Sequence, residues 1–291
     1  DRRQRQMCIR DRGYATAFFC GSAAGSMGFG AYARSAGIER LYSREDYEAR
    51  HGRDDFDGYW GIWDEPFLQY AGEEMSALPE PFFAALFTLS SHHPFVVPDA
   101  YRDLLPEGLT RNHKCVAYTD NAFRRFFARY AGEEWFRRTV FVFVADHVSS
   151  EKFADATRVF PGDHHIIGLL YTPDGALRGR CDEAVSQIDL MPTLFSLLNM
   201  SYDSHFYGRT IFDPAYVNRA FIATYQDLGY LEGDVFTILS PVRRFEQYRV
   251  VPTAENPHNL EPMEEKNREL VTRAVGYYQT LSLIHISEPT R

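Results

Sequence analysis

Two adjacent residues, Asp146 and His147, combine the kinds of side chain that hold a metal ion. They follow six apolar residues at 140–145 (VFVFVA), which are rich in β-branched and aromatic side chains. Such a short, uniformly apolar run predicts a strand covered on both faces, as in parallel sheets. Ligand sites of open α/β sheets lie beyond the carboxyl ends of these strands. A carboxylate beside an imidazole there can form half of a divalent cation site, although the pair also fits a capping aspartate and a loop histidine.

A second apolar run, at residues 81–89 (PFFAALFTL), also ends in polar residues, among them His92. Two strands that each release a histidine at the ligand edge of a sheet favour a functional site there. A third apolar strand is predicted within residues 164–173, but His164 and His165 stand at its start. We therefore expect these two histidines at the opposite edge, unless the strand is antiparallel, and give them little weight as ligands.

The segments between these strands predict an α/β fold. Apolar residues at helical spacing in residues 118–130 predict a helix, which makes the strands at 81–89 and 140–145 a βαβ unit with a right-handed crossover. Further expected elements are a strand at 13–20, a glycine-dense loop at 21–30, and helices at 31–37, 64–78, 190–200 and 264–280. Trp60, Trp63 and Phe67 share one face, which is more often core packing than a ligand cage. Beyond about residue 220 the pattern resembles a small antiparallel sheet.

The composition excludes several classes of protein. With 45% hydrophobic and 24% charged residues, the 291-residue chain is that of an ordinary globular protein. Its net charge of −9 and the lack of a basic stripe argue against nucleic acid as a partner. No run of about 18 apolar residues is present that could span a membrane, and no signal peptide is visible. The four cysteines form no CxxC pair.

Both ends of the sequence resemble translated sequencing-adapter read-through. Residues 1–12 (DRRQRQMCIRDR) are rich in arginine without apolar periodicity, and residues 281–291 (LSLIHISEPTR) follow a helical pattern without a cap. We therefore exclude both stretches from reasoning about the fold. We expect residues 13–213 to form the C-terminal part of a catalytic domain and residues 214–280 to form a small α+β subdomain.

As a set, five segments resemble the sulfatase-like branch of the alkaline phosphatase superfamily, in particular the lipoteichoic acid synthase-like (phosphoglycerol transferase-like) membrane enzymes. They are PFFAALFTLSSHHPF, YTDNAFRRFF, WFRRTVFVFVADH, HHIIGLLYTPD and SQIDLMPTLFSLLNMSYDSHFYGRTIF, and they occur in family order. The resemblance covers roughly residues 13–280. It implies a mostly parallel sheet flanked by helices, with a small C-terminal antiparallel subdomain.

The resemblance also implies roles for individual residues. Asp146 and His147 match the metal-binding ADH motif, and His92 matches an active-site histidine near the transferred phosphate. Cys20 stands where the family has a substrate-contacting histidine, which puts that contact in doubt, while Ser26 and Met27 lie in the substrate-side loop. Ile167 replaces a usual proline. No residue of this chain matches the nucleophile, and we expect the chain to be an inactive fragment that lacks it.

For the whole enzyme, the resemblance implies a transferase that moves a phosphoglycerol-type group from a lipid head group through a covalent intermediate. One divalent metal ion is implied, Mn²⁺ first, with Ca²⁺, Mg²⁺ or Zn²⁺ as alternatives. The implied substrate is an anionic lipid head group or a glycan, and the implied location is the cell membrane, with the catalytic domain outside the cytoplasm and anchored by N-terminal helices absent here. Two alternatives stay open: a sulfuric or phosphoric ester hydrolase of the same superfamily, and a non-catalytic binding domain.

Overall fold

The computed structural model describes residues 9–201 and 207–286, with side chains up to residue 280. The chain divides into two compact units. The first comprises Asp1–Ala145, Ser149–Phe153 and Ile167–Arg178, and the second comprises Asp146–Val148, Ala154–Ile166 and Gly179–Arg291. Asp146 and His147 thus belong to the second unit, whereas Cys20 and His92 belong to the first.

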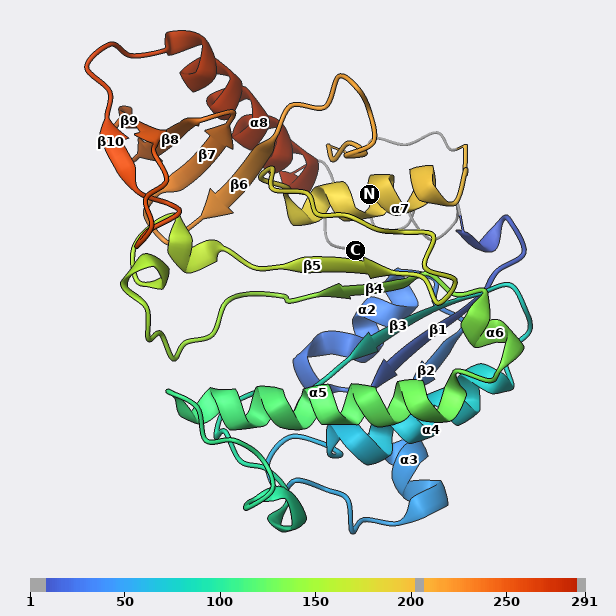
Figure 1. The fold of residues 1–291 in the computed structure, drawn as a ribbon. Helices are drawn as coiled ribbons and strands as arrows, with labels where there is room; N and C mark the ends of the chain where they lie inside the picture. The colour runs from blue at the N-terminus through green and yellow to red at the C-terminus, as the bar shows by residue number, and fades with distance from the viewer. Residues whose placement is uncertain (1–8, 202–206, 287–291) are drawn as a thin grey trace. The chain divides into compact units, whose positions relative to one another are not determined.

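A three-stranded parallel sheet forms the centre of the first unit. Strand β1 (Ala15–Cys20) lies between β2 (Arg40–Tyr42) and β3 (Phe82–Phe87) (Figure 1). Cys20 pairs with Phe87, so β1 and β3 finish together at one edge of the sheet. The strands predicted at 13–20 and 81–89 are therefore confirmed, and the segments that follow them leave from the same edge.

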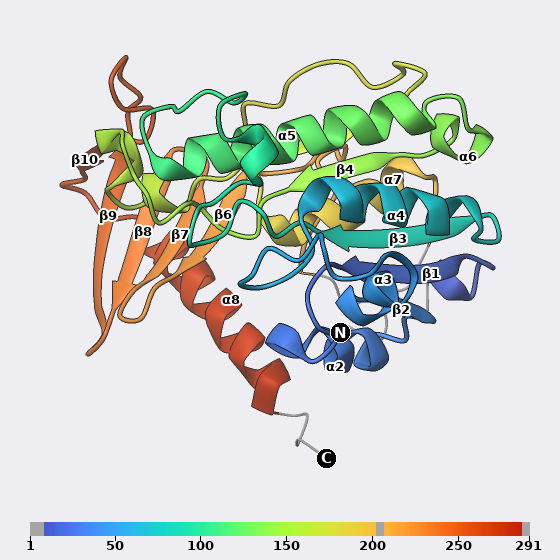
Figure 2. The same cartoon turned by 90° about the horizontal axis from the view of Figure 1, so that it is seen from below.

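Alternation along β1 determines which helices cover each face of this sheet. Ala17 and Phe19 point to a core shared with α3 (Arg44–His51), α4 (Asp64–Ser76) and α5 (Arg111–Tyr130). Phe18 and Cys20 point to the other face, where α2 (Phe29–Ser35) packs. Figures 1 and 2 show α2 on one side of the sheet and α4 and α5 on the other.

Helix α5 is the longest helix of the first unit and begins earlier than predicted. Its buried residues recur at helical spacing from Cys115 to Tyr130. Tyr130 also donates a hydrogen bond to the carbonyl of Gln69, at 2.7 Å. Its ring lies so close to Gly72 that a Cβ there would come within 2.1 Å of the ring, so α4 must carry glycine at this position. The short helix α6 (Glu134–Arg137) follows and buries Trp135 and Phe136.

Strands β4 (Phe141–Val144) and β5 (Gly168–Tyr171) differ from the prediction in their pairing. They form a separate two-stranded antiparallel sheet, so the expected parallel βαβ unit ending at residues 140–145 is wrong. Phe141 and Phe143 pack against α5, but Val142 and Val144 are 37% and 46% exposed. A short apolar run favours a strand but does not show which strand pairs with it or whether both of its faces are covered. The prediction that both faces of this strand are buried is therefore wrong for the face of Val142 and Val144.

A five-stranded antiparallel sheet characterises the second unit, as the predicted fold class requires. Its order is β10-β9-β8-β7-β6, and its strands are β6 (Arg219–Ala223), β7 (Leu228–Glu232), β8 (Val235–Ser240), β9 (Arg244–Val250) and β10 (Leu260–Pro262). Helix α8 (Arg268–Ile286) packs on it through Tyr278, whose hydroxyl donates to the carbonyls of Ile222 and Gly229. The boundary expected near residue 213 precedes β6 and stays a prediction.

Helix α7 (Leu190–Leu197) starts from a capping box in the second unit. Ser186 and Asp189 exchange side-chain and backbone hydrogen bonds across the single turn Gln187–Asp189. Asp189 is fully buried and lies 3.9 Å from the buried guanidinium of Arg219, the first residue of β6. This pair joins the start of α7 to the antiparallel sheet. Across residues 9–201 and 207–286, no helix has the length and apolarity needed to cross a membrane.

Candidate active site

Cys20 is the last residue of β1 and is only 1% exposed. Its Sγ lies 3.1 Å from the hydroxyl of Ser22, and burial raises the pKa of the thiol. A neutral thiol is a weak hydrogen-bonding group and a poor metal ligand. Cys20 therefore does not reproduce the charge or the donor strength of the histidine expected at this position.

The loop after β1 holds Ser26 and exposes Met27. Ser26 accepts a hydrogen bond from the indole Nε1–H of Trp60, with 2.8 Å between the nitrogen and Oγ. Met27 has a positive φ of 50° and is 80% exposed, so its side chain reaches into solvent beside the held serine. The loop thus presents one fixed hydroxyl and one free apolar side chain.

His92 lies beyond the carboxyl end of β3 with its ring exposed. Its Nδ1 is 2.9 Å from the carbonyl oxygen of His93. Because a carbonyl can only accept, Nδ1 must carry the hydrogen, which leaves Nε2 as the basic nitrogen of the neutral ring. The imidazole packs against Trp60, with 4.6 Å between the ring centroids. His92 can therefore offer Nε2 to a phosphate oxygen or to a leaving group.

Trp60 is the residue of this edge that the sequence did not assign to a site. The aromatic spacing of Trp60, Trp63 and Phe67 pointed to one core face. Trp60 lies before α4 begins; it packs on the core beside Phe87 and also contacts Ser26 and His92. Its position outside the helix, after the turn that starts at Asp57, was the only signal of a separate role.

Asp64 at the start of α4 fastens the end of β3. It is 3% exposed, and its carboxylate accepts hydrogen bonds from the amides of Leu89 (2.7 Å) and Ser90 (3.2 Å) and from the hydroxyl of Thr119 (2.7 Å). Burial raises the pKa of this carboxyl group, while the three donors oppose that shift. The chain just before His92 is thereby fixed to α4 and α5.

We expect Asp64→Ala to lower the free energy of unfolding by about 2–4 kcal/mol, because two buried amides and a hydroxyl lose their acceptor. Urea denaturation followed by circular dichroism measures this change. The control is Asp99→Ala, whose carboxylate is exposed and pairs with Arg102 at the surface. The control should change stability by less than about 0.5 kcal/mol. Equal effects of the two substitutions would contradict the anchoring role of Asp64.

Asp146 and His147 form a compact pair in the second unit. The amide of His147 donates to Oδ1 of Asp146 at 2.9 Å, and Nδ1 of His147 lies 2.7 Å from the carbonyl of Val148. These contacts leave Oδ2 and Nε2, which are 3.5 Å apart on side chains that are 60% and 73% exposed. The side-chain amide of Gln187 donates a hydrogen bond to the backbone carbonyl of Asp146, at 3.0 Å.

The pair has the chemistry of two metal ligands. A metal-binding histidine usually gives its second N–H to a carbonyl or carboxylate, and His147 gives its Nδ1–H to Val148. Carboxylate oxygen and imidazole nitrogen together suit Mn²⁺ or Zn²⁺. Among the residues that the structure describes, no group of three or more His, Cys, Asp or Glu side chains could hold a metal. Asp146 and His147 therefore fit half of a divalent cation site.

The other histidines singled out in the sequence have different partners. Nδ1 of His165 lies 2.9 Å from Nε2 of His258, and Nδ1 of His164 lies 2.8 Å from Asp163. Burial, with a smaller effect of His165, lowers the pKa of His258. Strand β5 is antiparallel to β4, so its start, Gly168, pairs with Val144 at the end of β4. The antiparallel alternative left open in the sequence is thus the one that the structure adopts.

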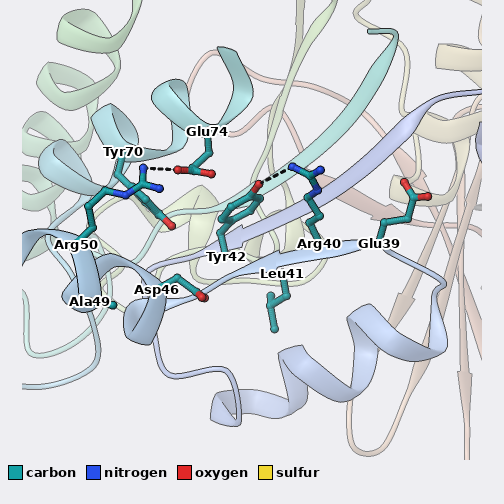
Figure 3. Close-up of a pocket in the computed structure, with 9 residues that line it drawn as sticks. All are labelled: Glu39, Arg40, Leu41, Tyr42, Asp46, Ala49, Arg50, Tyr70 and Glu74. Carbon is teal, nitrogen blue, oxygen red and sulfur yellow. Dashed lines mark hydrogen bonds and ion pairs between the residues drawn. The ribbon is translucent and has the colours of Figure 1, made fainter. Parts of the chain in front are cut away.

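A pocket of about 620 Å³ beside β2 contains none of the predicted site residues. Figure 3 shows its lining from β2, α3 and α4, with side chains of both charges facing one another. Arg50 pairs with Glu74, and Arg40 donates to the hydroxyl of Tyr42. Arg40 keeps its charge, but three carboxylates, of Glu39, Asp46 and Glu74, face only two guanidinium groups in this lining, so the pocket carries no excess of positive charge for a phosphate.

The fold defines the class of protein first. The structure superposes on a Vibrio parahaemolyticus protein of the alkaline phosphatase superfamily with a TM-score of 0.79 and 26% identity, over 95% of this chain and 68% of that one. It also superposes on the lipoteichoic acid synthase LtaP from Listeria monocytogenes with a TM-score of 0.73 and 20% identity, over 94% of this chain and 72% of that one. Both neighbours confirm the alkaline phosphatase-like fold.

The Sulfatase family model matches residues 8–200, and the chain therefore belongs to the Sulfatase family. Two Bacillus subtilis relatives are the lipoteichoic acid synthase-like protein YvgJ and lipoteichoic acid synthase 2. They are 27% identical over 183 residues and 20% identical over 208 residues, covering 56% and 66% of this chain. The chain spans about a third of the length of these relatives, 29% and 32%. The resemblance to this group of enzymes is confirmed.

Proposed function

We propose that this chain is part of a metal-dependent transferase that moves a phosphoglycerol-type group from a lipid head group outside the cytoplasm. The observation that carries the proposal is the Asp146–His147 pair, whose Oδ2 and Nε2 lie 3.5 Å apart while their other polar atoms are engaged. Membership of the Sulfatase family and the lipoteichoic acid synthase relatives support it.

In this proposal the chain contributes a proton-transfer group as well as metal ligands. Asp146 and His147 would hold the cation, which when bound lowers the pKa of a nucleophilic hydroxyl and neutralises phosphoryl oxygens. His92 would orient a phosphate oxygen or, when protonated, give its proton to the leaving alkoxide through Nε2, because Nδ1 is held by the carbonyl of His93. We assign no nucleophile among the residues of this chain.

One observation favours a second candidate, a non-catalytic binding domain. Cys20 is buried, and its pKa is raised, where the resemblance calls for a substrate-contacting histidine. A neutral thiol would hold a phosphate oxygen poorly. The presence of Cys20 would therefore reduce turnover while the fold stays intact. A sulfuric or phosphoric ester hydrolase of the same superfamily stays the other alternative; it would use water as the acceptor and differ in the nucleophile, which we do not assign in this chain.

The test is metal binding by the chain itself. We expect Mn²⁺ to broaden the ring signals of His147 selectively in nuclear magnetic resonance spectra, with a micromolar or weaker dissociation constant, because two ligands form only half a site. The Asp146→Ala substitution should remove the effect, and the control His164→Ala should not. Nanomolar affinity would contradict a half-site. His147 signals that survive millimolar Mn²⁺ would contradict the metal assignment.

A further inference from the structure

In the first unit, the indole of Trp60 contacts one residue that follows β1 and one that follows β3. Trp60 donates its Nε1–H to Ser26 in the loop after β1, and its ring packs against His92 after β3. The angle between the Trp60 and His92 ring planes is 59°, and the Trp60 ring also contacts Phe87 edge-on. Ser26 and His92 are 66 positions apart in the chain, and Trp60 contacts both of them.

The backbone of Trp60 is held firmly enough to make this connection rigid. The carboxylate of Asp57 accepts three consecutive amide hydrogens, from Tyr59 (2.8 Å), Trp60 (2.7 Å) and Gly61 (3.0 Å). Gly61 packs directly on the end of β1, since a Cβ there would lie 2.5 Å from the carbonyl oxygen of Gly21. The indole therefore extends from a tight turn that is fixed to the central strand.

We infer that Trp60 is a positioning residue, which holds the imidazole of His92 and the hydroxyl of Ser26 in one fixed relation for a shared substrate. The inference rests on the proposed function, which gives these two groups a common ligand. Asp64 fixes the backbone ahead of His92, whereas Trp60 fixes its ring. With Nδ1 engaged by the carbonyl of His93, the direction of Nε2 then depends on the indole.

Nuclear magnetic resonance on the chain itself tests this inference without any need for turnover. We expect Trp60→Leu to move the ring C–H signals of His92, because an aromatic neighbour is lost. Ser26→Ala should speed exchange of the Trp60 indole N–H roughly fivefold or more, as expected for loss of one hydrogen bond. The same Ser26→Ala change should shift the His92 signals in the wild-type chain but not in Trp60→Phe, which has already lost the bond.

The matched control is Trp63→Phe, three positions away, where the indole packs on Tyr118 instead. It should leave the His92 signals in place. If Trp60→Leu does not fold, Trp60→Phe and Ser26→Ala still decide the question through their non-additive effect on His92. His92 signals that respond to neither substitution would overturn the inference. Failure of the proposed function would appear separately, as intact His147 signals in Mn²⁺ with this coupling still present.

Discussion

We expect turnover to fall by at least about a thousandfold when Asp146 or His147 is replaced by alanine in a protein that carries this chain together with the additional parts of its relatives. A metal ion that stabilises transition-state charge contributes several kcal/mol, and each 1.36 kcal/mol is a factor of ten in rate. The two side chains are 60% and 73% exposed, so the free energy of unfolding should change by less than about 0.5 kcal/mol.

The measurement pairs release of a phosphoglycerol-type product with thermal unfolding of each variant. His164→Ala is the matched control, because it removes a histidine that also follows an aspartate in the second unit. We expect this control to keep its activity. Wild-type turnover in Asp146→Ala or His147→Ala would remove the basis for the metal assignment, and so would inactivity that merely follows unfolding.

The largest expected loss of stability follows Asp189→Ala in the second unit. Asp189 accepts hydrogen bonds from the amides of Ser186 (3.2 Å) and Arg209 (2.8 Å) and from the hydroxyl of Tyr216 (3.0 Å). Its carboxylate also lies 3.9 Å from the buried guanidinium of Arg219. Removing one partner of a buried pair leaves a buried charge uncompensated, which costs about 3–5 kcal/mol.

Because a domain is stable by only about 5–15 kcal/mol, this loss should bring the second unit close to unfolding at 37 °C. Urea denaturation gives the change, and Asp189→Asn separates the charge from the hydrogen bonds, since it retains one oxygen acceptor. Asp182→Ala serves as the control, since its exposed carboxylate pairs only with Arg180 at the surface. A loss below about 1 kcal/mol for Asp189→Ala would show that Arg219 is stabilised without it.

The sequence predicted those elements whose apolar pattern was long or clearly bounded. The run that became β1 ends at a glycine-dense loop and the run that became β3 ends in polar residues, and their parallel pairing follows from the α/β order. The helix predicted from residue 118 begins at Arg111 in the structure. The sequence did not reveal this start, because the first turn carries no acidic residue and Thr110 makes no side-chain capping bond. Helix ends without such caps leave little trace in the sequence.

Pairing partners and ring contacts were beyond the sequence for a physical reason. The apolar run at 140–145 is compatible with a parallel or an antiparallel neighbour, and only tertiary packing selected β5. In the same way, aromatic spacing could not distinguish Trp60, which contacts His92, from Trp63, which contacts Tyr118. The Asp146–His147 pair was identifiable because its two ligand types are adjacent and follow a strand.

His92 and His147 share one contact between the imidazole ring and the backbone. Each ring directs Nδ1 at the carbonyl of the very next residue, His93 or Val148. In each imidazole this backbone contact favours the tautomer with the hydrogen on Nδ1 and leaves Nε2 as the basic nitrogen. A side-chain substitution in a surrounding loop would therefore leave this carbonyl acceptor in place, because the acceptor belongs to the main chain of the next residue.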